Sequence, residues 1–242
     1  METTTQGFVL QAIPYGDSSL VVKMFTRQAG LQTYMVKGAR NRTSRNRVAF
    51  FQPMTFLRFV QNSRPPKAGG MGHLKELELD YTYQSIHLEM KKSAILIYVA
   101  ELLSHTLTQQ EQNEELYQFV YQSMAWLDLV EADYANFPLF FTLELTRFLG
   151  FYPHPNTLES GLFDMMEGCF VTNEPLHPYY FDREKSAIVA WLIHRPIEEI
   201  ASLKLNGAQR SELLEGLLTF VRLHAPLVKG LQSHEILREV LR

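Results

Sequence analysis

The sequence contains a long stretch of positive charge that has no counter-charge of its own. From Ser18 to Lys75 there are eleven Lys and Arg residues and not one Asp or Glu. So many cations need a polyanion, and the phosphate backbone of a nucleic acid is one that matches them. The densest part, residues 36–47, lies between two strand-like runs, where long side chains can leave a β scaffold and reach phosphates. The cations are Lys23, Arg27, Lys37, Arg40, Arg42, Arg45, Arg47, Arg58, Arg64, Lys67 and Lys75.

The alternative interpretation of this stretch is a solvated basic loop, because charge runs often only extend a chain. Two observations favour a binding surface. The acid-free zone continues into strands on both sides of the loop, and aromatic residues alternate with the cations, as a surface that stacks bases requires. We therefore predict a nucleic-acid-binding surface. Its candidate residues are Lys23, Arg27, Tyr34, Lys37, Arg40, Arg42, Arg45, Arg47, Phe56 and Arg58.

The composition favours two domains of opposite charge. With 242 residues, of which 46% are hydrophobic, the chain can bury one large core or two modest ones. Residues 1–80 hold 11 Lys and Arg against 5 Asp and Glu, a net charge of +6. Residues 81–242 hold 12 against 21, a net charge of −9. We therefore expect a nucleic-acid-binding domain at residues 1–82 and a second domain at residues 83–242.

Further features of the composition bear on location and metal content. The N-terminus has neither a basic n-region nor an apolar h-region, so nothing directs secretion. The most apolar run, residues 94–103, has half of the length that spans a membrane, and it contains Glu101. The single cysteine, Cys169, excludes an internal disulfide framework and a Cys-rich metal site within one chain. We expect a soluble, cytoplasmic protein without a cofactor.

The first third of the chain reads as short strands separated by turn chemistry. Pro14-Tyr15-Gly16-Asp17 and Gln28-Ala29-Gly30 are turn sequences, and residues 62–72 hold Pro and Gly in a loop that we expect to be mobile. A strand follows the glycine cluster of that loop, so the cluster does not fit a nucleotide-binding loop, which opens a helix. Five short strands fit a small closed barrel of the OB type, which binds oligonucleotides. The expected strands are residues 7–13, 18–26, 31–37, 54–60 and 73–81.

From residue 86 onward the hydrophobic period becomes helical. Residues 151–181 interrupt it with Pro and Gly around a strand-like run at 168–172, which indicates an inserted loop or hairpin. The fold class is α+β, with a five-stranded OB-type β-barrel followed by an all-α domain. The expected helix caps are Asn113, Asp182, Asn206 and Ser233, with Gly150 at a C-terminal cap position. The expected helices are residues 89–108, a helix after Asn113, and residues 138–149, 183–193, 208–224 and 234–241.

Several short motifs together resemble the RecO family of bacterial recombinational repair proteins. The most specific pair is the Lys-Gly-Ala-Arg junction at residues 37–40 in register with the upstream Gly16-Asp17 element. The helical part resembles the family less specifically. The matching motifs are Tyr15-Gly16-Asp17-Ser18-Ser19-Leu20, Phe25-Thr26 with Gly30, Val36-Lys37-Gly38-Ala39-Arg40 leading into Ser44-Arg45, Gln52-Pro53, Leu149-Gly150-Phe151, and Leu231-Gln232-Ser233-His234-Glu235-Ile236-Leu237.

This resemblance implies an N-terminal OB-fold, a helical C-terminal domain and binding of single- and double-stranded DNA. It also implies annealing of complementary strands, assistance in recombinase loading with a RecR partner, and a cytoplasmic, nucleoid-associated location. A further implied contact is with the acidic C-terminal tail of the single-stranded-DNA-binding protein. Candidates for that contact are Phe140, Arg147 and Phe148, because an aromatic groove with a nearby cation suits an acidic, Phe-ended tail.

Two other classes of protein compete with this interpretation. An enzyme is not supported, since the sequence has no His-Glu-x-x-His, no Gly-x-Ser-x-Gly, no nucleotide loop and no nuclease-like carboxylate cluster. An OB-fold RNA-binding or translation-associated module without an annealing role stays open, because phosphate contacts do not distinguish DNA from RNA. A direct competition between single-stranded DNA and RNA of equal length separates the two.

One departure from the family concerns metal. Many members of the family carry four zinc-binding cysteines in the segment that corresponds to residues 155–181, and here Cys169 stands alone. His154 and His177 add only two further donors, and three ligands make a poor structural zinc site. We predict that the purified protein contains less than stoichiometric zinc and keeps its thermal transition in chelator. Metal analysis and thermal melts test this; one tightly bound zinc per chain, with unfolding on its removal, would contradict it.

Overall fold

The computed structural model describes residues 2–40, 48–62, 70–108, 111–154, 161–226, 228 and 230–242. The chain separates into two compact units. The N-terminal unit comprises Met1–His87 and Leu107–Ala125, and the C-terminal unit comprises Leu88–Thr106 and Trp126–Arg242. A segment beyond residue 82 therefore packs with the N-terminal sheet, while the expected domain boundary at residues 82 and 83 stays a prediction.

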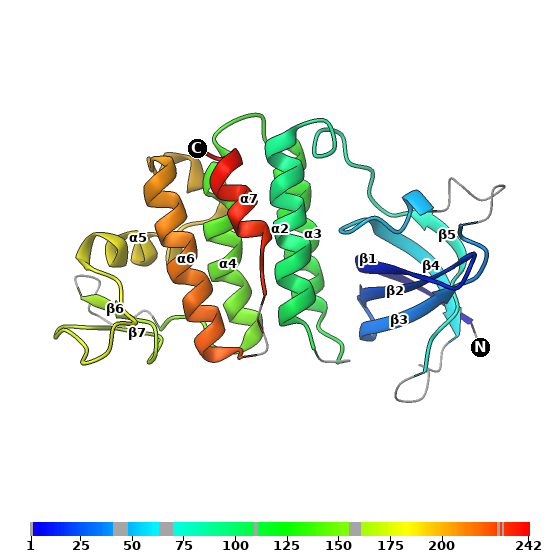
Figure 1. Cartoon of the computed structure of the whole chain (residues 1–242), viewed down its shortest axis with the longest axis horizontal. Helices are drawn as coiled ribbons and strands as arrows, with labels where there is room; N and C mark the ends of the chain where they lie inside the picture. The colour runs from blue at the N-terminus through cyan, green and yellow to red at the C-terminus, as the bar shows by residue number, and fades with distance from the viewer. Residues whose placement is uncertain are drawn as a thin grey trace. The chain divides into compact units, whose positions relative to one another are not determined.

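The N-terminal unit is built on one five-stranded antiparallel sheet (Figure 1). Its spatial order is β3-β2-β1-β4-β5, so the first strand lies at the centre. This central strand is long because its first half pairs with β4 and its second half with β2. The strands are β1 (Glu2–Tyr15), β2 (Ser19–Thr26), β3 (Gly30–Val36), β4 (Phe56–Asn62) and β5 (Lys75–Leu79).

The five strands were predicted correctly, but the closed barrel was not. The sheet is open, because its edge strands β3 and β5 do not pair with each other. Next to β5, Gly72 forms an isolated parallel bridge with Tyr34 of β3. The amide of Met35 donates to the Gly72 carbonyl at 2.9 Å, and the amide of Gly72 donates to the Thr33 carbonyl at 2.9 Å. One bridge joins the edges where full strand pairing would have closed the barrel.

Both faces of the sheet carry apolar side chains. Leu57 and Phe59 of β4 point into the core formed by the sheet with Val22, Met24 and Tyr34. On the opposite face the register places Phe8 beside both Phe25 and Phe56, so that three rings form a cross-strand row.

Helix α3 (Glu114–Leu129) covers this row of phenylalanines with its first turns. The ring centroids of Phe8 and Tyr117 lie 5.9 Å apart, and those of Phe56 and Tyr121 lie 5.0 Å apart. The predicted cap is confirmed, since the Asn113 side chain accepts a hydrogen bond from the Leu116 amide at 2.9 Å.

The turn between β2 and β3 depends on glycine. Gly30 has a φ of +61°, a conformation that residues with a Cβ rarely adopt. A Cβ at this position would also lie 2.0 Å from the backbone oxygen of Glu111 in the segment before α3. Gly30 therefore allows both the hairpin turn and the close approach of that segment.

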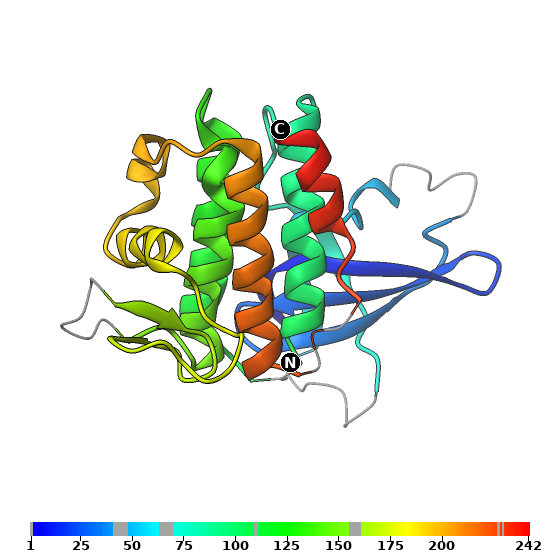
Figure 2. The same ribbon diagram turned by 60° about the vertical axis from the view of Figure 1, so that its left-hand side comes forward.

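The C-terminal unit is helical, as predicted, and Figure 2 shows its longer helices running side by side. The predicted caps Asp182 and Asn206 are confirmed, and Asn206 forms a reciprocal capping box with Gln209. Gly150 ends its helix with a φ of +86°. No helix in the described ranges is long and apolar enough to cross a bilayer. The helices are α2 (Met90–Thr106), α4 (Phe137–Leu149), α5 (Arg183–Ile193), α6 (Gly207–His224) and α7 (Ser233–Val240), with 3-10 turns η2 (Tyr134–Asn136) and η3 (Ile197–Ser202).

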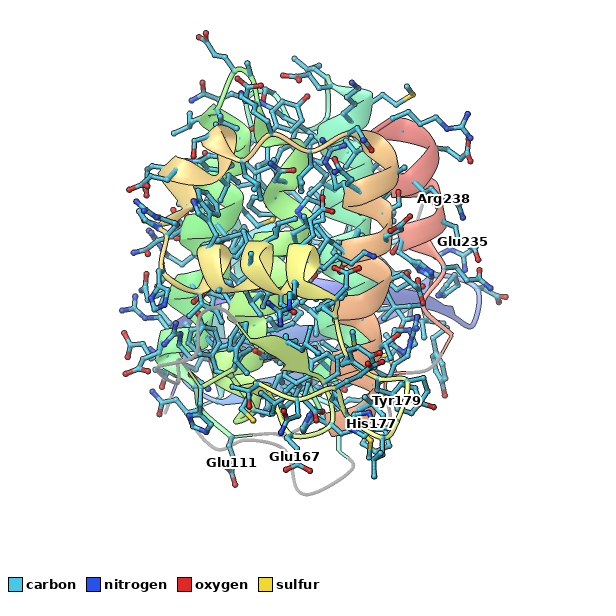
Figure 3. All side chains as sticks on the ribbon, turned by 90° about the vertical axis from the view of Figure 1, so that its left-hand side faces the viewer. Glu111, Glu167, His177, Tyr179, Glu235 and Arg238 are labelled. Carbon is cyan, nitrogen blue, oxygen red and sulfur yellow. The ribbon has the colours of Figure 1, made fainter. Side chains whose placement is uncertain are left out.

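The segment that interrupts the helical pattern contains a hairpin of β6 (Leu162–Asp164) and β7 (Cys169–Val171). Two potential metal donors among its described residues, Asp164 and His177, are engaged with protein groups. The Asp164 carboxylate accepts hydrogen bonds from the Met166 and Glu167 amides and lies 3.3 Å from His177, whose ring is next to Tyr179 (Figure 3). Among the described residues no three His, Cys, Asp or Glu side chains group as metal ligands.

The start of α7 differs from the prediction that Ser233 caps it. Ser233 is the first residue of the helix, and the capping group is the Glu101 carboxylate of α2. This carboxylate accepts hydrogen bonds from the Gln232 amide at 3.1 Å, from the Ser233 amide at 2.8 Å and from the Ser233 hydroxyl. Partial burial acts to raise the pKa of Glu101, but these hydrogen bonds outweigh it and hold the pKa below its usual value.

We predict that Glu101→Gln lowers the free energy of unfolding by about 1 kcal/mol at pH 7, because α7 loses a charged cap. The pKa of Glu101 is lower in the folded state than in the unfolded state. Its contribution is therefore present above about pH 4.3, the value of an unperturbed glutamate, and is lost as the pH falls through the folded-state pKa.

Urea unfolding of the wild type and Glu101→Gln between pH 3.5 and 8 measures this difference. The difference in unfolding free energy between the two proteins should shrink as the pH falls toward 3.5. Glu131→Gln, at an exposed glutamate outside the helices, is the matched control and should change little. A gap that stays constant with pH would contradict a role for the carboxylate charge.

Candidate nucleic-acid interface

Two of the predicted cations, Lys37 and Arg40, lie at the end of the sheet where the β1–β2 hairpin turns. The amide of Arg40 donates to the Ser18 carbonyl at 2.9 Å, and its guanidinium donates to the Gly16 carbonyl at 3.3 Å. These bonds hold the residues after β3 against the hairpin turn. Both cationic side chains are exposed to solvent. Asp17 in the same turn is also exposed, so the described cations outnumber the carboxylate by one.

Tyr15 is a residue of this surface that the prediction missed. It is the last residue of β1, it lies directly before Gly16, and it is 57% exposed. The neighbouring Ile13 is 50% exposed. The sequence carried a signal for Tyr15, an aromatic residue within a polar turn, because such a ring has no core to enter. Arg40 donates to the carbonyl of Gly16, the residue after Tyr15, so the same turn carries an exposed ring and a cation, the two features that single-stranded nucleic acid requires.

Two other predicted cations, Arg27 and Arg58, are engaged in ion pairs at the opposite end of the sheet. Arg58 lies 2.8 Å from the Asp80 carboxylate and 3.4 Å from that of Glu78. Arg27 pairs with Glu114 of α3 and donates to the Gln6 side chain at 2.9 Å. The hydrogen bond with Glu114 raises the pKa of Arg27.

Gln6 joins these two pairs into one network. Its amide nitrogen donates to both oxygens of the Asp80 carboxylate at 2.9 Å, and its amide oxygen accepts from Arg27. The Asp80 side chain is only 3% exposed, so its charge depends on these partners. A phosphate would have to displace this internal network before it could contact Arg27 or Arg58.

The predicted cations therefore lie in separate places along the sheet, some near one end and some near the other. The eight residues of β2 span about 23 Å, with Lys37 and Arg40 near one end and Arg27 at the other. Lys23 lies between, opposite Gln11 and Thr33, and is half-buried. Three further candidates lie outside the described residues: Arg42, Arg45 and Arg47.

The two aromatic residues predicted to stack on bases are in the core. Tyr34 is 1% exposed, packs edge-on against Phe59, and donates its hydroxyl to the Gln61 side chain at 2.5 Å. Burial raises the pKa of this hydroxyl. Phe56 is also 1% exposed and lies beneath Tyr121. Neither ring has a face on which a base could stack, so the burial of both contradicts their predicted role.

The three residues predicted to receive an acidic tail lie on α4 of the C-terminal unit. Phe140 is buried and Phe148 is half-buried. Arg147 is exposed, stacks at 3.8 Å over the ring of Tyr152 and lies 3.2 Å from the Glu144 carboxylate. Its charge is thus already partly balanced, and any acidic ligand here competes with Glu144.

Comparison with known proteins identifies relatives over nearly the whole chain. The family model described as Recombination protein O N terminal matches residues 1–83, and the one described as Recombination protein O C terminal matches residues 87–230. Proteins named DNA repair protein RecO are similar along their full length. The one from Phocaeicola vulgatus is 30% identical over 237 residues, 98% of each chain. The one from Flavobacterium psychrophilum is 32% identical over 242 residues, 99% of each chain.

Proposed function

Because the chain belongs to the RecO family and so has a function in DNA repair, we propose that it binds single- and double-stranded DNA, anneals complementary strands and assists recombinase loading. The observation that carries the binding proposal is the exposed group of Lys37, Arg40 and Tyr15 at one end of the sheet. Among the described residues, this surface offers phosphate contacts and a stacking ring but no element that reads base edges, such as a recognition helix.

Annealing by such a surface needs no bond chemistry. Cations that neutralise phosphates lower the repulsion between two strands, and a ring that stacks a base keeps the strand open for pairing. The charge on Lys37 and Arg40 serves the first requirement, and the exposed ring of Tyr15 serves the second. The protein is accordingly proposed to act as a mediator and not as an enzyme.

Two protein partners complete the proposal. One is a RecR-type mediator, with which the chain would assist recombinase loading. The other is the acidic C-terminal tail of the single-stranded-DNA-binding protein, which would bind near Phe140, Arg147 and Phe148 and hold the chain at exposed single strands. With these partners the protein would act in the cytoplasm, at the nucleoid.

We predict that Lys37→Ala and Arg40→Ala each reduce the slope of log affinity against log salt by roughly 0.7 on single-stranded DNA, because each removes one phosphate contact. The loss of affinity should be nearly equal for every sequence tested. Arg58→Ala is the matched control, because this cation is already paired with Asp80. It should leave the salt slope unchanged and lower the free energy of unfolding by about 1 to 3 kcal/mol, since the buried Asp80 carboxylate loses a partner.

The stacking part of the same surface is tested with Tyr15→Ala in the same salt series. This variant should weaken binding by about 1 to 3 kcal/mol without a change in slope, because a ring carries no charge. Tyr179→Ala removes an exposed ring of the C-terminal unit and is the control. Unchanged slopes for Lys37→Ala and Arg40→Ala would mean that these cations are only solvated. A clear preference for RNA of equal length would favour the RNA-binding alternative.

We predict that Arg147→Glu weakens binding of an acidic, Phe-ended tail peptide by at least tenfold. The variant replaces a cation beside Glu144 by a negative charge, which repels the acidic peptide. Fluorescence anisotropy with the full-length chain measures this. The full chain is needed because a cut at residue 83 would separate Tyr117 from its packing against Phe8.

Arg195→Glu is the matched control for this measurement. Arg195 is also an exposed arginine that pairs with a glutamate of its own segment, Glu199 at 2.8 Å, and lies near an aromatic ring, that of Trp191. It should leave peptide binding unchanged. Equal affinities for the wild type and Arg147→Glu would remove the tail site from α4.

A further inference from the structure

The N-terminal sheet has an exposed face beyond the rings that α3 covers. Residues paired directly across antiparallel strands share a face, and so do alternate residues along one strand. Lys23 therefore lies on the same face as Phe25, whose partner Phe8 packs against Tyr117 of α3. From Lys23 toward the β1–β2 turn this face continues in three rows of side chains. The rows are Gln11 with Lys23 and Thr33, Ile13 with Val21 and Met35, and Tyr15 with Ser19.

The middle row of the exposed face is apolar. Where the other side of an antiparallel sheet is buried in a core, outward positions are usually polar. Here Ile13 is 50% exposed, and its cross-strand neighbours Val21 and Met35 are half-buried. Tyr15, in the next row, is 57% exposed. These side chains are direct neighbours and form one patch, and contiguous exposed apolar patches mark binding surfaces.

The exposed face has cations on both sides of its apolar row. Lys23 belongs to the row on one side and is half-buried. Lys37 directly follows β3 on the other side, and its side chain is exposed. None of the eight side chains in the three rows is acidic, and Asp17 lies outside them, in the turn after Tyr15. Apolar flat groups joined by anions fit this arrangement, and an unpaired strand of nucleic acid presents such groups.

The apolar row distinguishes unpaired bases from paired ones. It crosses three strands, about 10 Å, and the ring of Tyr15 follows about 7 Å further along β1. The side chains of Ile13, Val21 and Met35 have no group that hydrogen-bonds to base edges, so they can only pack against the faces of bases. In a duplex these faces are stacked on one another, and the phosphates and the base edges in the grooves remain accessible. The row therefore favours a single strand.

We propose that the exposed face holds the unpaired bases of a single DNA strand and loses them when the strand pairs, so that a duplex is held by phosphate contacts alone. The inference rests on the proposed function and adds to it a reason why the annealed product is released. Lys37 and Arg40 contact the phosphates of either form, whereas Tyr15 and the apolar row contact only the single strand. A duplex held by charge alone is readily released by salt.

The first test uses the double variant Ile13→Thr, Met35→Gln of the full-length chain, with a single-stranded oligonucleotide and a duplex of the same length at one salt concentration. Threonine keeps the β-branched shape and glutamine the unbranched one, so the strands are preserved while apolar surface is lost. The affinity for the single strand should fall at least about fivefold, the lower end of the range for loss of one stacked base. The affinity for the duplex should stay the same. Lys37→Ala should weaken binding of both forms.

The matched control is the double variant Ile97→Thr, Met166→Gln. Both residues belong to the C-terminal unit, and they are 49% and 46% exposed. This control should change neither affinity, and a thermal melt of each double variant checks that it is folded. Equal weakening of single strand and duplex by Ile13→Thr, Met35→Gln would overturn the inference. An unchanged affinity for the single strand would also overturn it and would leave the exposed face to a protein partner.

The second test needs no variant. The wild type is compared on a single strand and on an abasic strand of equal length and charge, and the abasic strand should bind at least about fivefold more weakly. Equal affinity for the two strands would overturn the role of the exposed face while phosphate binding, and thus the proposed function, stays in place. A wild type that binds neither of these strands nor the duplex would overturn the proposed function itself.

Discussion

The buried carboxylate of Asp80 determines which cations of the N-terminal unit are engaged in ion pairs and which remain accessible to a ligand. A charge that is 3% exposed is stable only when it is paired and hydrogen-bonded. Arg58 and Gln6 meet this need, and Gln6 in turn holds Arg27 against the sheet. Arg27 and Arg58, the cations around Asp80, therefore stabilise the fold. Those at the hairpin end, Lys37 and Arg40, have exposed side chains that a ligand can reach.

The acid-free stretch of the sequence is neutralised in part by acids that lie outside it. Glu2 pairs with Lys75, Asp80 with Arg58, and Glu114 with Arg27, over separations of up to 87 residues. Linear charge counting finds a basic domain but cannot find these partners, because they come from other strands and from α3. The surface available to a polyanion is consequently smaller than the stretch of sequence that revealed it.

Strands, helices and most caps were predictable because they follow from local periodicity and turn chemistry. The roles of Tyr34 and Phe56 were not, because a strand that is apolar on both faces does not indicate which face is covered. Here both faces are covered, one by the core and one by Tyr117 and Tyr121 of α3. The buried Lys92 is a similar case. It is 1% exposed and donates to the Asp128 and Val130 carbonyls at the end of α3, a bond that no local pattern indicates.

The short hairpin of β6 and β7 shows how packing can organise a segment that has little secondary structure of its own. Strands of three residues are too short to be stable as an isolated pair. The ring of Phe163 lies 5.3 Å from that of Phe170 and 5.2 Å from that of Phe220 on α6, so the hairpin is fixed to a helix through its own core residue. The Asp164 carboxylate closes the turn by accepting two amide hydrogen bonds. Ring packing and one carboxylate thus hold the described part of this segment in place.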